Sequence, residues 1–158
     1  MSAIARTVLA FSAIFALAPP TSPASEGSAC NVTMPGSMRQ IEQGFYGGDE
    51  LAFSGPWPDG TVVFKPGGPG FVLPDGSLSM KFGWRRGTHG ALKISGRRLD
   101  TTAPPLRSDV PDGFGDIGFQ PTAVIFPTPG CWEVTGRVGD ASLTFVTKVL
   151  KIGAGPSD

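Results

Sequence analysis

The sequence predicts an all-β domain, an antiparallel β-sandwich of about seven strands. Apolar and polar residues alternate in several short runs, which is the two-residue period of a half-buried strand. Gly (23 residues) and Pro (16 residues) of the 158 separate these runs and act as turn punctuation. No stretch after the first 24 residues has the period of an amphipathic helix.

The clearest alternation is in residues 78–84, where Leu78, Met80, Phe82 and Trp84 share one face. The loop 85–90 is short enough to join this run to residues 91–97 as a hairpin, and Gly139-Asp140 offers positive φ for another. The predicted strands are residues 51–54, 61–65, 78–84, 91–97, 122–126, 131–138 and 143–149. The side chains predicted to be core are Phe82, Leu92, Ile94, Trp132, Val134, Leu143 and Phe145.

The tripeptide Pro-Asp-Gly occurs three times, at residues 58–60, 74–76 and 111–113. Proline presets φ at the second position of a turn, aspartate bonds to its own backbone, and glycine tolerates positive φ. We interpret the three copies as turns and not as ligand sites.

Residues 1–24 have the pattern of a secretory signal peptide. Arg6 precedes an apolar run over residues 8–18, and small residues at 22 and 24 allow cleavage before Ser25. The run is too short for a membrane span, which needs about 20 apolar residues. We therefore expect an exported protein, in the periplasm, the envelope or outside the cell, with no transmembrane anchor. Lipidation of Cys30 is the alternative.

Cys30 and Cys131 are the two cysteines of the chain, and an exported protein favours their pairing as a disulfide. The predicted organisation after the signal peptide has three parts. Residues 25–48 form an irregular arm anchored by Cys30, residues 49–152 form the β-sandwich, and residues 153–158 form a disordered tail.

The segment Pro129-Gly130-Cys131-Trp132-Glu133-Val134 resembles the entry to a late strand in immunoglobulin-like modules of secreted bacterial proteins. Residues 127–149 together with 66–81 resemble an uncharacterised family of exported bacterial proteins with an immunoglobulin-like β-sandwich domain. The resemblance implies an immunoglobulin-like fold and an exported location, and it carries no known activity. Because Cys30 precedes the first strand, the disulfide would tie down the arm and would not join two sheets.

The sequence lacks the residues that several classes of function require. The chain has one histidine, His89, and no Gly-x-Ser-x-Gly, so a serine nucleophile has no oriented base. Two cysteines and one histidine are too few for structural zinc, and a net charge of zero does not favour nucleic acid. We expect no enzyme, no catalytic residue, no metal and no cofactor. Two alternatives stay open. One is a carboxylate-based hydrolase, with candidates Asp100, Asp109, Asp112 and Asp116, and the other is calcium binding by Asp109, Asp112 and Asp116.

The remaining hypothesis is a non-catalytic binding module whose end loops contact a protein or glycan partner. Tryptophan and arginine are enriched at binding hot spots, and arginine forks favour carboxylates. The alternative is a structural envelope protein without a defined ligand. The predicted binding residues are Trp57, Phe71, Arg85, Arg86 and His89. The loop that holds Phe114 is a further candidate, and Trp84 is expected in the core.

Overall fold

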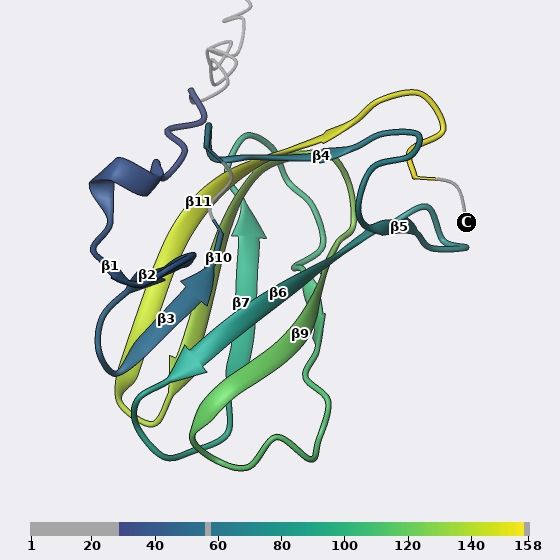
Figure 1. The fold of residues 1–158 in the computed structure, drawn as a ribbon. Helices are drawn as coiled ribbons and strands as arrows, with labels where there is room; N and C mark the ends of the chain where they lie inside the picture. Colours follow the sequence, from purple (N-terminus) through teal and green to yellow (C-terminus); the bar gives the residue numbers. More distant parts are fainter. Residues whose placement is uncertain (1–28, 56–57, 157–158) are drawn as a thin grey trace, which may run out of the picture.

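The structure is a computed structural model that describes residues 29–55 and 58–156. In this part of the chain there are eleven strands, one short 3-10 helix and no α-helix (Figure 1), which confirms the all-β prediction. The elements are η1 Pro35–Ser37, β1 Gln40–Glu42, β2 Phe45–Gly47, β3 Leu51–Ser54, β4 Thr61–Phe64, β5 Phe71–Val72, β6 Leu78–Arg86, β7 Lys93–Arg98, β8 Arg107–Asp109, β9 Gly118–Phe126, β10 Gly130–Val138 and β11 Ala141–Lys151.

The strands form two sheets. The first has the order β1-β2-β3-β6-β9-β8, with β5 also paired to β6, and the second has the order β4-β11-β10-β7. Every pairing is antiparallel except that of β4 with β11, which is parallel. The prediction of antiparallel sheets therefore holds with one exception.

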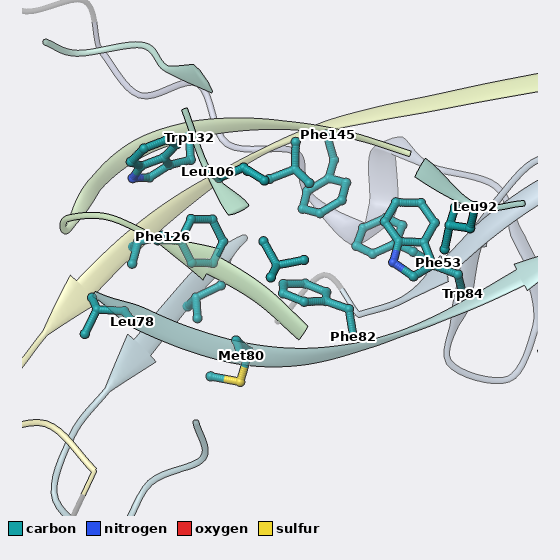
Figure 2. Packing of buried hydrophobic residues seen from close by; sticks show 14 of the residues in the cluster. Phe53, Leu78, Met80, Phe82, Trp84, Leu92, Leu106, Phe126, Trp132 and Phe145 are labelled. Carbon is teal, nitrogen blue, oxygen red and sulfur yellow. The ribbon is translucent and has the colours of Figure 1, made fainter. Parts of the chain in front are cut away.

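One apolar core lies between the two sheets (Figure 2). Phe53 of β3 stacks on Phe145 of β11 with ring centroids 4.0 Å apart, and this contact joins the sheets. Trp84 and Trp132 are fully buried. Of the predicted core residues, Phe82, Leu92, Trp132, Val134 and Phe145 are buried, while Ile94 and Leu143 are partly buried against the core.

All seven predicted strands are present, and four further strands of two or three residues were missed. Two of these, β1 and β2, lie in the segment 25–48 that was predicted to be irregular, so that prediction is wrong for residues 40–47. In the first sheet β2 lies beside β3 and pairs with Ala52, Phe53 and Ser54, and β1 lies beyond β2 at the edge of the sheet. A three-residue strand contains too few residues for a two-residue period to be visible in sequence.

The predicted hairpin between residues 78–84 and 91–97 is also wrong. β6 pairs with β9 in the first sheet, whereas β7 pairs with β10 in the second. Alternation identifies the buried face of each strand but does not say to which sheet the strand belongs. The connection between them crosses from one sheet to the other and begins at Gly87.

The Pro-Asp-Gly segments at residues 58–60 and 74–76 form turns as predicted, whereas the third, at 111–113, forms only a bend. Asp59 accepts a hydrogen bond from the backbone N–H of Thr61 at 3.0 Å, and Asp75 accepts one from Ser77 at 3.0 Å. The glycines at 60, 76 and 113 have φ of 67°, 81° and 90°. The first two turns lead directly into β4 and β6.

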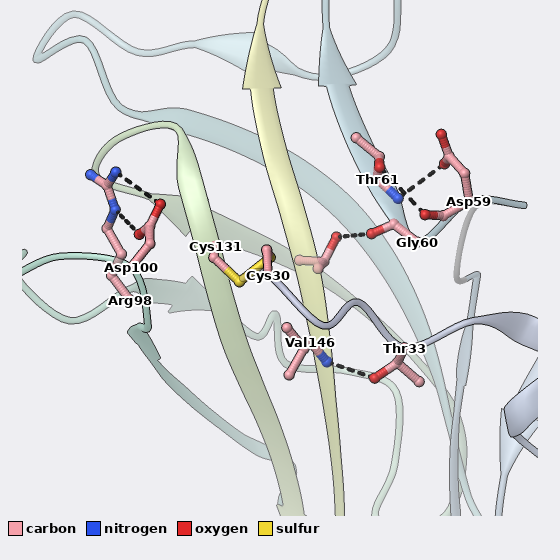
Figure 3. Close-up of a disulfide and its surroundings, with 10 residues drawn as sticks. Cys30, Thr33, Asp59, Gly60, Thr61, Arg98, Asp100, Cys131 and Val146 are labelled. Atoms are coloured by element: carbon pink, nitrogen blue, oxygen red, sulfur yellow. Dashed lines mark hydrogen bonds and ion pairs between the residues drawn. A yellow bond between two sulfur atoms is a disulfide. The ribbon is translucent and has the colours of Figure 1, made fainter. Parts of the chain in front are cut away.

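Cys30 and Cys131 form the predicted disulfide, which links the arm to β10 (Figure 3). Next to it, the backbone N–H of Thr33 donates to the carbonyl oxygen of Val146 at 2.8 Å. The N–H of Val146 in turn donates to the Thr33 Oγ1 at 2.9 Å. The arm is therefore fixed to neighbouring strands of the second sheet by one covalent bond and two hydrogen bonds.

Both ends of the chain lie partly outside the described residues. The predicted signal peptide, residues 1–24, falls entirely outside them. Within the described residues, no helix has the length and apolar character needed to cross a membrane. Of the predicted disordered tail, residues 153–156 are described and contain a turn in which Gly155 is buried, and residues 157–158 are not described.

Candidate functional site

The predicted binding residues do not gather at one place. Phe71 is 47% exposed on β5 and pairs with Ser79, near the start of β6. Arg85 and Arg86 are the last two residues of β6, roughly 20 Å further along at about 3.3 Å per residue. Trp57 lies outside the described residues. The structure therefore separates Phe71 from the arginines.

Arg85 and Arg86 point to opposite faces of the first sheet. Arg85 is exposed, and its Nε lies 3.3 Å from Glu42 Oε2. Arg86 is only 2% exposed. The prediction that both arginines stand on a protruding loop is therefore wrong. The inward–outward alternation of β6 continues past Trp84, so Arg86 falls on the core side.

The Arg86 guanidinium is held by backbone carbonyls of two loops. Nη1 donates to the oxygen of Gly90 at 3.1 Å, and Nη2 donates to that of Phe114 at 3.0 Å. Nε makes a longer contact of 3.5 Å to the oxygen of Gly118. Among the described residues Arg86 has no ion pair with a carboxylate. This buried cation is thus stabilised by neutral dipoles.

A pocket of about 180 Å³ opens beside Arg86. Leu92, Val110 and Phe114 form apolar parts of its lining, and Leu92 also belongs to the core cluster (Figure 2). Gln120, which is 3% exposed, lines it too and donates from Nε2 to the carbonyl oxygens of Pro111 and Pro121. Arg86 and Gln120 therefore both anchor the loop that follows β8.

His89 is exposed and contributes to the same end of the molecule. Its Nδ1 lies 3.0 Å from Asp116 Oδ2, and this hydrogen bond holds the pKa of the Asp116 carboxyl below its usual value. The backbone N–H of Gly90 also donates to the carbonyl oxygen of Asp116 at 2.8 Å. The connection between β6 and β7 is thereby fastened to the loop before β9.

A second pocket of about 450 Å³ shares Ala91 with the first and is lined by His89, Lys93 and Arg137 among others. Lys93 of β7 and Arg137 of β10 are directly opposite in register, and both are exposed. Among the described residues neither has an ion pair. Like charges directly opposite on adjacent strands are destabilising.

We call the surface around these two pockets the end face, comprising residues 86–93, 110–120 and 137–140. In Figure 1 it is the lower end, where the connection from β6 to β7 and the hairpin from β10 to β11 both turn. It also exposes Phe114 (42%) and Ile117 (43%). The sequence analysis missed Lys93, Arg137 and Gln120. Their proximity to Arg86 depends on pairing between distant segments, for which a single sequence contains no signal.

Asp100 and Asp116, two of the four candidate carboxylates, are engaged in structural contacts, as is Asp75 of the second Pro-Asp-Gly turn. Hydrogen bonds from Ser77, with help from Arg107, lower the pKa of Asp75 to about 2. A hydrogen bond from Arg98 lowers the pKa of Asp100. In the described ranges no three His, Cys, Asp or Glu side chains are grouped so that they could hold a metal ion, and Asp109, Asp112 and Asp116 form no such group.

A larger pocket of about 500 Å³ lies along β4, with Pro58, Thr61 and Val63 in its lining. It brings together none of the predicted binding residues that the structure describes. The end face is therefore the better candidate.

Comparisons with known proteins add no family or relative, because no family model, no curated protein and no solved structure matches this chain.

Proposed function

We propose that the chain is an exported, immunoglobulin-like β-sandwich that acts as a non-catalytic binding module. Its partner is a protein or glycan that bears carboxylates, and the end face is the contact surface. The resemblance of residues 127–149 and 66–81 to exported bacterial proteins belongs to the same proposal.

The strand order supports the immunoglobulin-like assignment. An immunoglobulin constant-type domain has strands A, B, E and D in one sheet and C, F and G in the other. The order β3-β6-β9-β8 matches A-B-E-D, and β7-β10-β11 matches C-F-G. The chain departs from that pattern in its additional strands and in its disulfide. β1, β2 and β5 add to the first sheet, β4 adds to the second by parallel pairing with β11, and the disulfide ties the arm to β10 and does not join the two sheets.

Export is supported by the apolar run of residues 8–18 and by the Cys30–Cys131 disulfide, which persists in oxidising compartments. In export-competent bacterial cells, we expect the recovered protein to begin at Ser25. Intact-mass and N-terminal peptide mass spectrometry measure this directly. Protein that retains Met1 in such cells would refute export.

The observation that carries the binding proposal is the exposed Lys93–Arg137 pair. Folding alone gives no reason to place two like charges opposite each other, since the arrangement costs stability. A partner with carboxylates would turn this repulsion into attraction and would also pair with exposed His89 when it is protonated. The end face has three acids, Asp112, Asp116 and Asp140. In the described part of the chain none of them forms an ion pair with Lys93 or Arg137, so the repulsion between these two cations is not relieved within the domain.

The binding proposal is tested with a double variant, Lys93→Gln with Arg137→Gln. The probes are an immobilised glutamate-rich peptide and a carboxylated polysaccharide, with binding measured by interferometry. We expect the double variant to lose affinity about tenfold or more, because two charge-assisted contacts are removed. Its thermal midpoint should be unchanged or slightly higher, because a repulsion is relieved.

The matched control is Lys81→Gln with Lys148→Gln, which removes the same charge from exposed positions on β6 and β11. We expect this control to bind like the wild type. If both double variants weaken binding equally, the attraction is non-specific and the end face is not the site. If the wild type binds neither probe, the carboxylate proposal fails.

The hydrolase alternative is not favoured by the titration of its candidate groups. A glycosidase acid needs a pKa raised above the usual range. The pKa values of Asp100 and Asp116 are both lowered, mainly by side-chain hydrogen bonds with Arg98 and with His89. Such carboxylates stay ionised at neutral pH and cannot donate a proton there.

A further inference from the structure

We propose that the pocket beside Arg86 is a binding site for a single aliphatic carboxylate. This inference rests on the proposed function, since it names the group through which a carboxylate-bearing partner enters the end face. It concerns residues that differ from the exposed Lys93–Arg137 pair. The argument depends on the charge balance of Arg86, its free donors and the shape and lining of the pocket.

The charge of Arg86 is not balanced by a contacting acid. A buried ion costs several kcal/mol unless an opposite charge or good hydrogen bonds compensate it. Three backbone carbonyls contribute dipoles but no net charge. Asp116 acts on Arg86 only through space, because its carboxylate is exposed and hydrogen-bonded to His89. An anion within contact distance would complete the compensation.

The guanidinium also has donors to spare. An arginine side chain carries five N–H groups in a fixed planar fork. Arg86 uses one on Gly90, one on Phe114 and one on the longer contact to Gly118. Two N–H groups, one on each Nη, therefore have no acceptor in the described part of the chain. Each of them can donate to a carboxylate oxygen, and hydrogen bonds between a guanidinium and a carboxylate are charge-assisted.

The pocket has the size and lining for a short aliphatic acid. Its volume of about 180 Å³ is comparable to a cavity that accepts benzene. Arg86 supplies a cationic part of the lining, and Leu92, Val110 and Phe114 supply apolar surface for an alkyl group. Asp112 is the one carboxylate in the lining, and it is exposed and makes no ion pair with Arg86.

The site is also pre-organised. Gln120 uses both of its side-chain N–H groups on the carbonyl oxygens of Pro111 and Pro121, and Arg86 binds the oxygen of Phe114. The loop over the pocket is thus held at two points by buried side chains. A ligand that binds a pre-formed pocket loses less affinity to ordering. The same chemistry is offered by a free small acid, by a glutamate or aspartate side chain and by a chain terminus.

The test is an NMR titration of the oxidised, mature protein with sodium butyrate, following the Arg86 Nε–H and the amides of Leu92 and Gln120. We expect saturable shifts at these groups. Butanamide, which is neutral and of the same shape, should shift them about tenfold more weakly. Equal responses to butyrate and butanamide, or no saturable response to butyrate, would overturn the proposal.

Two variants test whether butyrate binds in the pocket beside Arg86. Arg86→Lys keeps the charge but loses the fork, and Ala91→Phe adds a bulky ring at an exposed position that lines the pocket and leaves the Arg86 side chain itself unchanged. We expect each to weaken butyrate binding about tenfold. The matched control is Arg85→Lys, on the opposite face of the same strand, which should bind like the wild type. If Arg86→Lys fails to fold, Ala91→Phe still decides. Wild-type affinity in Ala91→Phe rules out the pocket.

Competition experiments show which kind of carboxylate the pocket accepts and whether phosphate competes with it. A peptide with a free C-terminal carboxylate is compared with its C-terminal amide and with a peptide that carries an internal glutamate. Either carboxylate peptide displacing butyrate supports the proposal and identifies the source. If inorganic phosphate displaces butyrate at equal or lower concentration, the site is a general oxyanion site and the proposal is wrong.

The two proposals can fail separately. The Lys93→Gln, Arg137→Gln variant should still bind butyrate, because neither residue belongs to the lining given for the pocket beside Arg86. The Arg86→Lys and Ala91→Phe variants could lose butyrate binding and still be retained on the carboxylated probes. In that case the pocket binds free acids only and is not the place where the larger partner enters. If the wild type binds butyrate but neither of the larger probes, the proposal for the pocket holds and the proposed carboxylate-bearing partner is refuted.

Discussion

Removing the Cys30–Cys131 disulfide is expected to lower the free energy of unfolding by about 4–5 kcal/mol. The two cysteines are 101 residues apart in a chain of 158, so the bond closes a long loop and restrains much of the chain in the unfolded state. Domains of this size are stable by only about 5–15 kcal/mol in total. Urea unfolding of the oxidised protein and of a Cys30→Ser, Cys131→Ser variant measures the difference.

A control separates the covalent bond from the packing of the arm. Thr33→Val removes the hydroxyl that accepts from the N–H of Val146 and leaves the disulfide intact. It should cost about 1 kcal/mol, the usual value of one hydrogen bond. In the serine variant, the amide of Val146 should also exchange faster with solvent, because the arm is released. A loss below about 1.5 kcal/mol would contradict the chain-entropy explanation.

Trp132→Ala is expected to cost about 3–5 kcal/mol, the range for a fully buried large side chain. Trp132 is completely buried and packs edge-on against Phe126 with ring centroids 5.8 Å apart. Its Nε1 donates to the carbonyl oxygen of Thr128 at 3.0 Å. Truncation therefore leaves a cavity and a carbonyl without its donor. Chemical unfolding of the oxidised variant measures the loss.

Thr135→Ala is the matched control, since Thr135 lies on the other face of the same strand. Its hydroxyl shares an exposed hydrogen bond with Thr144, so we expect a loss below about 1 kcal/mol. If Trp132→Ala also costs less than about 1 kcal/mol, the inside–outside register assigned to β10 is wrong.

Much of the fold could be predicted from the sequence because its long strands carry a clear period. In β10, Trp132, Val134 and Val138 alternate with Glu133 and Arg137, and the structure buries the first set. What failed was pairing between strands. β6 and β7 are adjacent in sequence and both alternate, yet they belong to different sheets. Nothing in a two-residue period encodes the choice of sheet.

The candidate site was predicted only in part, for a related reason. Arg86 was selected for its charge and assigned to a loop, because the apolar run ends at Trp84. Continuing the alternation by two residues would have turned Arg86 inward. The Lys93–Arg137 pair had no local signal, since 44 residues separate the two side chains that the β7–β10 register brings together. A long-range like-charge pair becomes visible only when the sheet is assembled.

The parallel pairing of β4 with β11 has a consequence for the order in which the chain can fold. Thr61 pairs with Lys148, and the Thr147 hydroxyl donates to the carbonyl oxygen of Gly60, 87 residues away in sequence. A chain emerging from the ribosome or crossing a membrane from its N-terminus presents β4 long before its partner exists. Val62 and Phe64, fully buried in the finished domain, must stay uncovered until the last strand arrives. Such long-range closure slows folding and prolongs the exposure of apolar segments. The domain is therefore expected to complete its second sheet only after synthesis, and β4 is the strand most exposed to aggregation during that delay.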